Sequence, residues 1–355
     1  MSKDLPTAHI KDTIAIVVTN EANENFSYRL GDVGMSLTLT EKQAREIEAF
    51  CQIAGENGAA ISLRELIGLA AIEANEHELA AAFRSDSKLG SKFLLESGYV
   101  LDRHTVAEGT SRQTVEEEER RRGLAQANLK MARRFGTALT KGAVLVSVSG
   151  ANSFLSAGKE DDIDFFCVTK TNGMWPFMLR ALILARIHRL ANKDVAELCF
   201  SCVMDERWAT QTFRKRQHPI FARDALTAKV IEGKSTYHVL LEEARWMEDY
   251  FPAFYSMRLR ETNPREGRST RDGAVGREGS FVLNSFLFHT LGAFLRMKSW
   301  TLNRKLAKAG RRSAVFATRI GVGHHIYESN RYRKLRKLYD VVEKDLREPS
   351  GGNDR

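Results

Sequence analysis

Two aspartates separated by one residue, Asp162 and Asp164, are the pair in this sequence with the clearest chemical meaning. They open an apolar run that ends at Val168, and this pattern predicts a strand. Because alternate side chains of a strand share a face, both carboxylates project together, with Cα atoms about 6.6 Å apart. Two bare charges at that distance repel by roughly 2.5 kcal/mol at an effective dielectric constant of about 20. A compensating cation is therefore expected, and a hard, oxygen-seeking ion such as Mg²⁺ fits.

The residues before this pair predict a second strand and a tight turn. Val144–Val148 is an apolar run typical of a buried strand, and it stops at Ser149-Gly150. A short turn of small residues follows, and then a charged loop that contains Lys159. The two strands and the glycine turn are thus the elements that must position the two acids.

The same residues carry a family resemblance. Gly150-Ala151, ten further residues and then Asp162-Ile163-Asp164-Phe165 resemble the signature of the nucleotidyltransferase superfamily, which includes DNA polymerase beta and the aminoglycoside nucleotidyltransferases. The segments Gly98–Val168 and Trp246–Pro252 also look like a bacterial and archaeal nucleotidyltransferase-domain family. The resemblance implies an α/β (α+β) fold in which a nucleotidyltransferase core is built on a small mixed sheet.

In that family a Gly-Ser or Gly-Gly pair starts a helix whose amide groups hold the triphosphate, while the two acids bind two Mg²⁺ ions, with Mn²⁺ as a substitute. The resemblance therefore assigns catalysis and metal binding to Asp162 and Asp164. Ala151 replaces the usual second Ser or Gly, which loses a hydroxyl contact and leaves the phosphates to backbone N–H groups. Asn152 and Ser153 are candidate substitutes for that hydroxyl, and Lys159 would lend positive charge. The full set of expected nucleotide-binding residues is Ser149, Gly150, Ala151, Asn152, Ser153 and Lys159.

A third carboxylate is also implied by the resemblance, on a strand that follows the next helix. Ala196-Glu197-Leu198 has the hydrophobic–acid–hydrophobic setting that is common there, so Glu197 is the candidate third catalytic acid. It would complete the metal shell or accept a proton from the acceptor. Asp194 and Asp205 are competing candidates.

Composition limits the choice of function class. The 355 residues contain 54 Lys and Arg against 45 Asp and Glu, which gives a net charge of +9 and favours anionic partners. The longest apolar run, Trp175–Ile187, is too short and too charged for a membrane span, so no membrane partner is expected. The four cysteines lie in apolar stretches and are interpreted as reduced core residues of a cytoplasmic protein.

Residues 1–105 are expected to form an N-terminal module that resembles a winged helix. Capping sequences begin helices at Thr40, Ser62 and Asn75, and two short apolar runs flank Ser97-Gly98 as in a hairpin. Such a module either contacts DNA or RNA or simply packs against the rest of the chain. The acidic character of its third helix favours packing.

The remaining chain divides into a nucleotidyltransferase core over 106–257, a flexible linker over 258–280, a C-terminal helical region over 281–345 and a tail over 346–355. Within the core, a long helix over Thr114–Leu139 is expected to begin with a capping box. Thr290–Lys344 contains fourteen Lys or Arg against three Asp or Glu. This excess predicts a surface for RNA or another polyanionic acceptor, although a solvated helix face accounts for it equally well.

Together these patterns predict a Mg²⁺-dependent nucleotidyltransferase that moves a nucleoside monophosphate from an NTP to an unidentified acceptor and releases pyrophosphate. The alternative is a catalytically degenerate regulatory protein that only binds nucleotide or nucleic acid. The missing hydroxyl at Ala151 and the uncertain third acid would suit that alternative.

Overall fold

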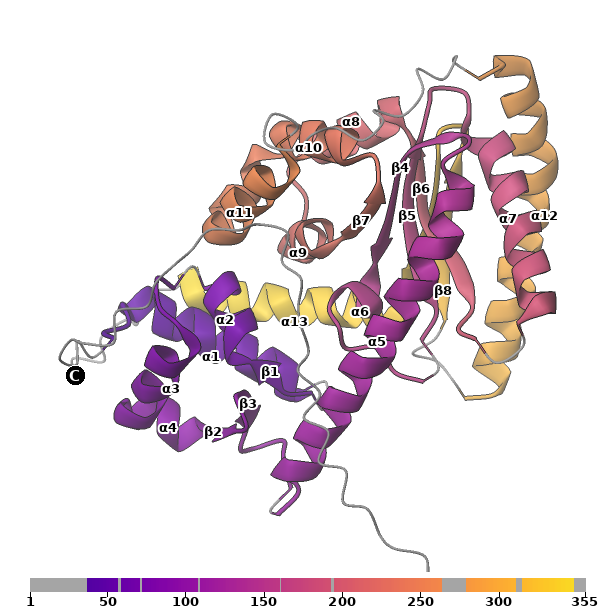
Figure 1. Ribbon diagram of the computed structural model, residues 1–355. Helices are drawn as coiled ribbons and strands as arrows, with labels where there is room; N and C mark the ends of the chain where they lie inside the picture. The colour runs from indigo at the N-terminus through magenta and orange to yellow at the C-terminus, as the bar shows by residue number, and fades with distance from the viewer. Residues whose placement is uncertain are drawn as a thin grey trace, which may run out of the picture. The chain divides into compact units, whose positions relative to one another are not determined.

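The computed structural model describes residues 37–347, apart from 57–58, 71, 108, 160, 193–194, 264–278 and 311–314. Contacts between Cα atoms divide the chain into Met1–Met35 and Ser36–Arg355, and every described element belongs to the second unit. That unit has a mixed α and β fold with two sheets (Figure 1). No helix within the described ranges is long and apolar enough to cross a bilayer.

The N-terminal part alternates helices with the strands of a small antiparallel sheet. Its elements are α1 (Glu41–Glu56), β1 (Ile61–Ser62), α2 (Leu63–Leu69), α3 (Glu76–Ser85), α4 (Ser87–Lys92), β2 (Phe93–Glu96) and β3 (Tyr99–Asp102), with the strand order β1-β3-β2. The predicted caps are present, because Ser62 accepts a hydrogen bond from the Glu65 amide and Asn75 forms a capping box with Glu78. The hairpin predicted at Ser97-Gly98 joins β2 to β3.

A six-stranded mixed sheet forms the centre of the unit. Its strands, in spatial order, are β7 (Lys229–Glu232), β4 (Ala143–Ser149), β5 (Ile163–Thr169), β6 (Leu198–Asp205), β9 (His324–Ser329) and β8 (Phe316–Gly321). The β5–β6 pair is parallel, and α7 (Met174–Ala191) makes the crossover between these two strands. The other pairs are antiparallel.

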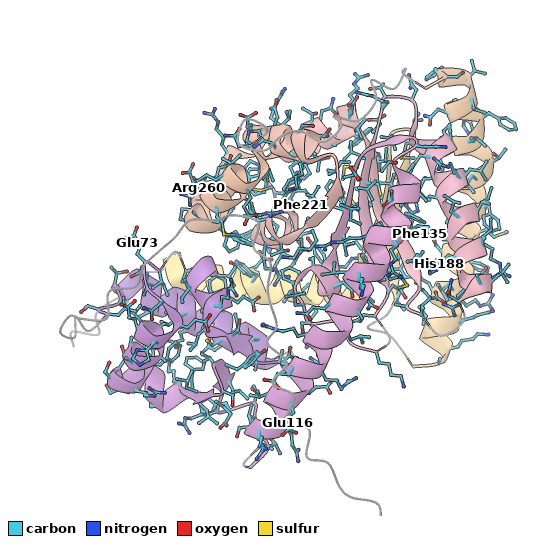
Figure 2. All side chains as sticks on the ribbon, in the orientation of Figure 1. Glu73, Glu116, Phe135, His188, Phe221 and Arg260 are labelled. Carbon is cyan, nitrogen blue, oxygen red and sulfur yellow. The ribbon has the colours of Figure 1, made fainter. Side chains whose placement is uncertain are left out.

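One face of this sheet packs against three long helices (Figure 1). These are α5 (Ser111–Leu139), α7 and α12 (Phe281–Lys308). Ile163, Phe165 and Cys167 of β5 point into this layer. Phe135 of α5 meets His188 of α7 there, with ring centroids 5.5 Å apart (Figure 2).

The opposite face of the sheet is covered by the other helices that follow β6 in the chain. They are α8 (Glu206–Arg214), α9 (Pro219–Thr227), α10 (Lys234–Glu243), the 3-10 helix η1 (Arg245–Asp249), α11 (Pro252–Thr262) and α13 (Asn330–Arg347). Phe166 and Val168 of β5 join the core on this side, which also contains the N-terminal helices. The alternation along β5 therefore places Asp164, like Phe166, on the second face.

The C-terminal region differs from the sequence-based expectation. Residues 281–345 were expected to be helical, but β8 and β9 form a hairpin that extends the central sheet through β6. The linker expected over 258–280 is helical as far as Thr262, and 264–278 lie outside the described residues. The helix expected from Thr114 starts at Ser111, so the capping box expected there does not exist. The expected tail begins inside α13, and 348–355 are not described.

Candidate functional site

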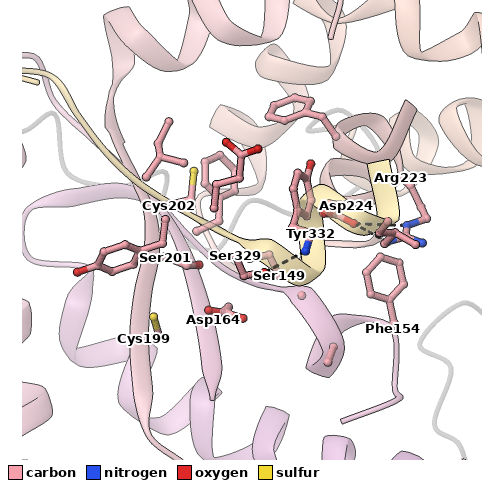
Figure 3. Close-up of a pocket in the computed structure, with 18 of the residues that line it drawn as sticks. Ser149, Phe154, Asp164, Cys199, Ser201, Cys202, Arg223, Asp224, Ser329 and Tyr332 are labelled. Atoms are coloured by element: carbon pink, nitrogen blue, oxygen red, sulfur yellow. Dashed lines mark hydrogen bonds and ion pairs between the residues drawn. The ribbon is translucent and has the colours of Figure 1, made fainter. Parts of the chain in front are cut away.

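Asp162 and Asp164 lie in the wall of one large cavity, with a volume of about 1620 Å³. The turn residues Ser149, Gly150 and Ala151 line the same cavity. The β4–β5 ladder explains this proximity, because Ser149 is paired directly with Asp164. The turn that follows β4 and the carboxylates that begin β5 therefore meet at one point of the wall (Figure 3).

Gly150 packs directly against Asp164. Its backbone is left-handed, with φ of +67°, and a Cβ atom at this position would lie 2.8 Å from Asp164 Oδ2. Both the conformation and the contact require glycine. The backbone at the start of α6 (Gly150–Ser153) therefore lies close to the Asp164 carboxylate, with no room for a side chain between them.

The environment of the two carboxylates favours their protonated forms. Burial, and then the charge of Asp162, raise the pKa of Asp164 to about 7, although hydrogen bonds from Ser201 and Cys199 oppose the shift. Burial and the charges of Glu197 and Asp161 raise the pKa of Asp162 to about 6. A cation placed between the two groups would relieve this cost.

The side chains of Asn152 and Ser153 are not where the resemblance implied. Both are buried, and neither is among the residues that line the cavity. The Asn152 amide donates to the Asp162 carbonyl oxygen at 2.8 Å and accepts from Asn128 of α5 at 2.9 Å. The Ser153 hydroxyl donates to the Gly150 carbonyl oxygen at 2.8 Å. These two side chains brace the turn and the start of β5, and are not placed to contact phosphate.

An Asn152→Ala protein should fold with lower stability, because the buried Asn128 amide and Asp162 carbonyl would lose their shared partner. The expected loss is about 1–3 kcal/mol, measured from urea unfolding midpoints. Ser153→Ala is the matched comparison, since it removes only a local bond within one turn and should cost less than about 1 kcal/mol. Equal losses in the two proteins would contradict the bracing role of Asn152.

Glu197 lies beside Asp162 at the start of β6. Its carbonyl oxygen accepts from the Ile163 amide at 2.7 Å, and its carboxylate pairs with Arg189 at 2.6 Å. The side chain is 62% exposed. The residues of β6 that contact Asp164 are Cys199 and Ser201, so the register offers no carboxylate at that position.

The competing third acids are no better placed. Asp205 ends β6 and caps α8, where its carboxylate accepts from the Trp208 amide at 2.9 Å. Asp194 lies outside the described residues. Of the two candidate third acids that the structure describes, Glu197 is therefore the one beside the pair, and Arg189 holds it.

A Glu197→Gln protein should keep most of any transfer activity, with a loss of less than about tenfold. Glutamine preserves the side-chain shape, and the carboxylate that it replaces is exposed and already neutralised by Arg189. The comparison is the initial rate of label transfer in the two proteins at equal concentration. A loss above a hundredfold would identify Glu197 as the third catalytic acid after all.

Lys159 is exposed and is not part of the cavity wall. The basic side chains that do line the cavity come from several elements: Arg122 of α5, Lys215 after α8, Arg223 of α9, Lys298 of α12, Arg319 of β8 and Arg336 of α13. Sequence reasoning missed this set because its members are far apart along the chain. The only sequence signal was the basic excess after residue 290.

Arg223 forms an ordered part of the wall opposite the carboxylates (Figure 3). Its guanidinium lies 4.4 Å from the centroid of the Phe154 ring and bonds Asp224 at 3.1 Å. Burial raises the pKa of Asp224 and of Tyr332, and the Arg223 charge acts against the shift of Asp224. This wall offers a charged, planar and partly aromatic surface to a ligand. From the sequence, this segment was predicted only to form a short helix.

The donor set fits a magnesium ion delivered with a phosphate ligand. Mg²⁺ in proteins is commonly held by one or two carboxylates, with water and substrate phosphates completing its octahedron. Asp162 and Asp164 supply those two carboxylates. No group of three or more His, Cys, Asp or Glu able to hold a metal occurs in the part of the chain that the structure describes. The site thus suits a shared cation better than a closed all-protein metal cage.

Comparison of the chain with known proteins identifies no relative. The chain matches no protein-family model, no curated protein and no solved structure.

Proposed function

We propose that this protein is a Mg²⁺-dependent nucleotidyltransferase. The observation that carries the proposal is the contact at the cavity wall, where a left-handed glycine after β4 touches the second of two carboxylates that open β5. Two acids whose pKa values are raised mainly by burial, a backbone turn and a large cavity support transfer from an NTP at this site. The sequence resemblance to nucleotidyltransferases supports the same reading.

In the proposed reaction the acceptor's hydroxyl or amine attacks the α-phosphorus of the NTP. The bond from that phosphorus to the oxygen bridging the α- and β-phosphates breaks, and pyrophosphate leaves with the electron pair. Bound Mg²⁺ would supply charge neutralisation on the phosphates. Asp162 and Asp164, ionised beside the cation, would orient the reacting groups, and the acceptor's proton would leave to water.

Cations elsewhere in the cavity wall would neutralise the rest of the triphosphate. Arg122, Arg223 and Lys298 line the cavity without being part of the carboxylate pair. Arg223 also carries the flat surface over Phe154 on which a base or sugar can lie. We assign to these side chains the role that the sequence resemblance had given to Lys159.

The acceptor is proposed to be RNA or another polyanion. The N-terminal element order resembles that of a winged helix with the helix α4 added, and this likeness is the support for a nucleic-acid role of that module. Near the cavity, Arg319, Arg333 and Arg336 surround Glu328 at 3.5–3.8 Å, so part of the basic charge of the C-terminal region is neutralised within the protein. Lys334 and Lys337, which are exposed on α13, would form the contact.

A transfer assay tests the proposal. The protein is incubated with each α-labelled NTP, Mg²⁺ and a cell extract that supplies acceptors, and label is followed onto RNA, protein and small molecules. Transfer that needs Mg²⁺ and the intact Asp164 carboxylate supports the proposal. Absence of transfer with all four NTPs, in Mg²⁺ and in Mn²⁺, would contradict it.

Divalent ion binding should depend steeply on pH. Asp164 in the folded protein binds a proton with a pKa of about 7, against an ordinary value of 3.8, so the folded state holds more protons between those values. Without a divalent ion, its contribution to stability is therefore lost as pH rises from about 4 to 7. Mg²⁺ should raise the melting temperature at pH 8 and leave it unchanged at pH 5, and Asp164→Asn should abolish the pH 8 shift. An equal Mg²⁺ effect at both pH values would contradict the shared-cation site.

The alternative of a degenerate, regulatory binding protein rests on one specific observation. Cys199 and Ser201 occupy the β6 register beside Asp164, where a third acid would complete the site. Mg²⁺-dependent NTP binding, measured by calorimetry, without label transfer to any acceptor would favour the regulatory binding protein over the enzyme.

A further inference from the structure

The outer side of α7 and α12 is the most extensive exposed apolar surface among the described residues. The two helices lie side by side on one face of the central sheet (Figure 1). On α7 the exposed residues follow helical spacing at Leu179, Ile183, Ile187 and Leu190. On α12 they are Phe281, Val282, Leu283, Phe286, Phe294, Met297 and Trp300. These eleven side chains are called the α7–α12 face.

The α7–α12 face is too large to be ordinary surface. Its four aromatic side chains are between 51% and 63% exposed. Since an aromatic side chain covers about 150–250 Å², these four alone leave roughly 400–500 Å² of apolar surface in water. The seven other side chains take the face beyond the 300–600 Å² of the largest patch on a typical monomer. A partner is therefore expected to cover it.

The charge of the two helices selects the kind of partner. Together α7 and α12 contain eight Lys or Arg and no Asp or Glu. Arg186, Lys305 and Lys308 are exposed. Arg304 lies 5.5 Å from the Trp300 ring, on the outer side of α12. An apolar stripe bordered only by positive charge complements a partner that is both apolar and anionic.

A second copy of this chain does not meet that requirement. In a two-fold dimer the same patch occurs on both partners, so exposed basic side chains such as Arg186, Lys305 and Lys308 would be brought together from the two copies, with no acid on either helix to pair with them. Such like-charge contacts are unfavourable. An anionic bilayer offers phosphate headgroups to the basic side chains and an acyl layer to the apolar ones.

We propose that the α7–α12 face binds the surface of an anionic lipid bilayer, with both helices lying in the plane of the interface. Aromatic and aliphatic side chains enter the acyl boundary, and the basic side chains contact the headgroups. The inference departs from the sequence-based expectation of no membrane partner, which rested on the lack of an apolar run long enough to span a bilayer. It does not rest on the proposed enzymatic function, because none of the eleven side chains of the α7–α12 face lines the cavity that contains Asp162 and Asp164.

Co-sedimentation of the full chain with vesicles tests the proposal. Vesicles of phosphatidylcholine alone are compared with vesicles that contain 30% phosphatidylglycerol, at about 0.1 M and about 0.5 M salt, so that electrostatic binding is screened in the second condition. Binding is expected only to the anionic vesicles and mainly at low salt. It should be accompanied by a blue shift of tryptophan fluorescence that the Trp300→Phe protein lacks, because Trp300 is 63% exposed and Trp175 is fully buried.

Substitutions separate the electrostatic contribution to vesicle binding from the apolar contribution. Removing three charges with R186Q, K305Q and K308Q together should weaken binding roughly 100-fold, at about fivefold per charge. Phe286→Ser and Phe294→Ser should each weaken it about tenfold or more. Val239→Ser is the matched control, since Val239 is 52% exposed on α10, away from the α7–α12 face.

Several results would overturn the proposal. One is absence of binding to anionic vesicles. Another is binding that the Phe286 and Phe294 variants retain in full. A third is a dimer in sedimentation velocity that the same variants dissociate, which would assign the face to a second copy. Melting temperatures of all variants, measured in parallel, show whether any loss of binding reflects loss of folding.

Discussion

An Asp164→Asn protein is expected to lose nucleotidyl transfer by about a thousandfold or more while remaining folded. Asparagine keeps the shape of the side chain that packs against Gly150, but it removes the charge that would hold a cation shared with the triphosphate. A charge interaction realised at the reacting phosphate is worth several kcal/mol, and each 1.4 kcal/mol is a factor of ten in rate. Initial rates of label transfer, measured at saturating NTP and Mg²⁺, give the loss directly.

The same substitution should stabilise the metal-free protein. A loss of transfer together with a gain in stability cannot be explained by unfolding. At pH 8 the wild-type protein must keep two ionised carboxylates together in a partly buried wall, and the amide removes one of those charges. A shift of the Asp164 pKa from 3.8 to about 7 corresponds to a gain on the order of 4 kcal/mol for the variant. Unfolding in urea with a chelator present should show this gain.

Glu206→Gln provides the comparison for this experiment. Glu206 is an acid outside the large cavity, paired with Lys170 at 2.8 Å, and its loss should change neither transfer nor Mg²⁺ binding appreciably. If Asp164→Asn still transfers label at more than a tenth of the wild-type rate, the carboxylate pair is not the catalytic metal site.

Local patterns predicted the elements around the candidate site well. The apolar run after Ala143, the glycine turn and the acid-led strand are consecutive in the chain, so their pairing follows from short-range geometry. The same is true of the Ser62 and Asn75 caps and of the hairpin at Ser97-Gly98. In each case the residues that determine the structure are neighbours in sequence.

The features that were missed depend on contacts between distant segments. The β8–β9 hairpin pairs with β6, more than a hundred residues earlier, although Gly321-Val322-Gly323 between two β-prone runs was an available turn signal. The basic wall residues come from α5, α9, α12 and α13, and no local pattern groups them. Asn152 looked like a free polar group because its partner Asn128 lies on another helix.

The second large expected effect is the loss of transfer when Gly150, in the turn after β4, is replaced. Gly150→Ala should reduce transfer about a hundredfold, because the new methyl group would lie 2.8 Å from Asp164 Oδ2 and must displace either the carboxylate or the turn. Alanine in a left-handed conformation also costs about 1–2 kcal/mol of stability. A misplacement of about 1 Å in a reacting group is enough to cost a factor of a hundred in rate.

Gly98→Ala separates the contact from the backbone strain. Gly98 also has a left-handed backbone, with φ of +80°, but an added Cβ would meet no atom within 4 Å. It should therefore lose a similar 1–2 kcal/mol of stability while keeping full transfer activity and the Mg²⁺-dependent rise in melting temperature at pH 8. Gly150→Ala should lose both the transfer activity and the Mg²⁺-dependent rise in melting temperature. If the two alanine proteins behave alike in transfer and in Mg²⁺ response, the close approach of Gly150 to Asp164 has no part in the chemistry. The turn would then be a structural feature, and the degenerate binding protein would become the better account of the site.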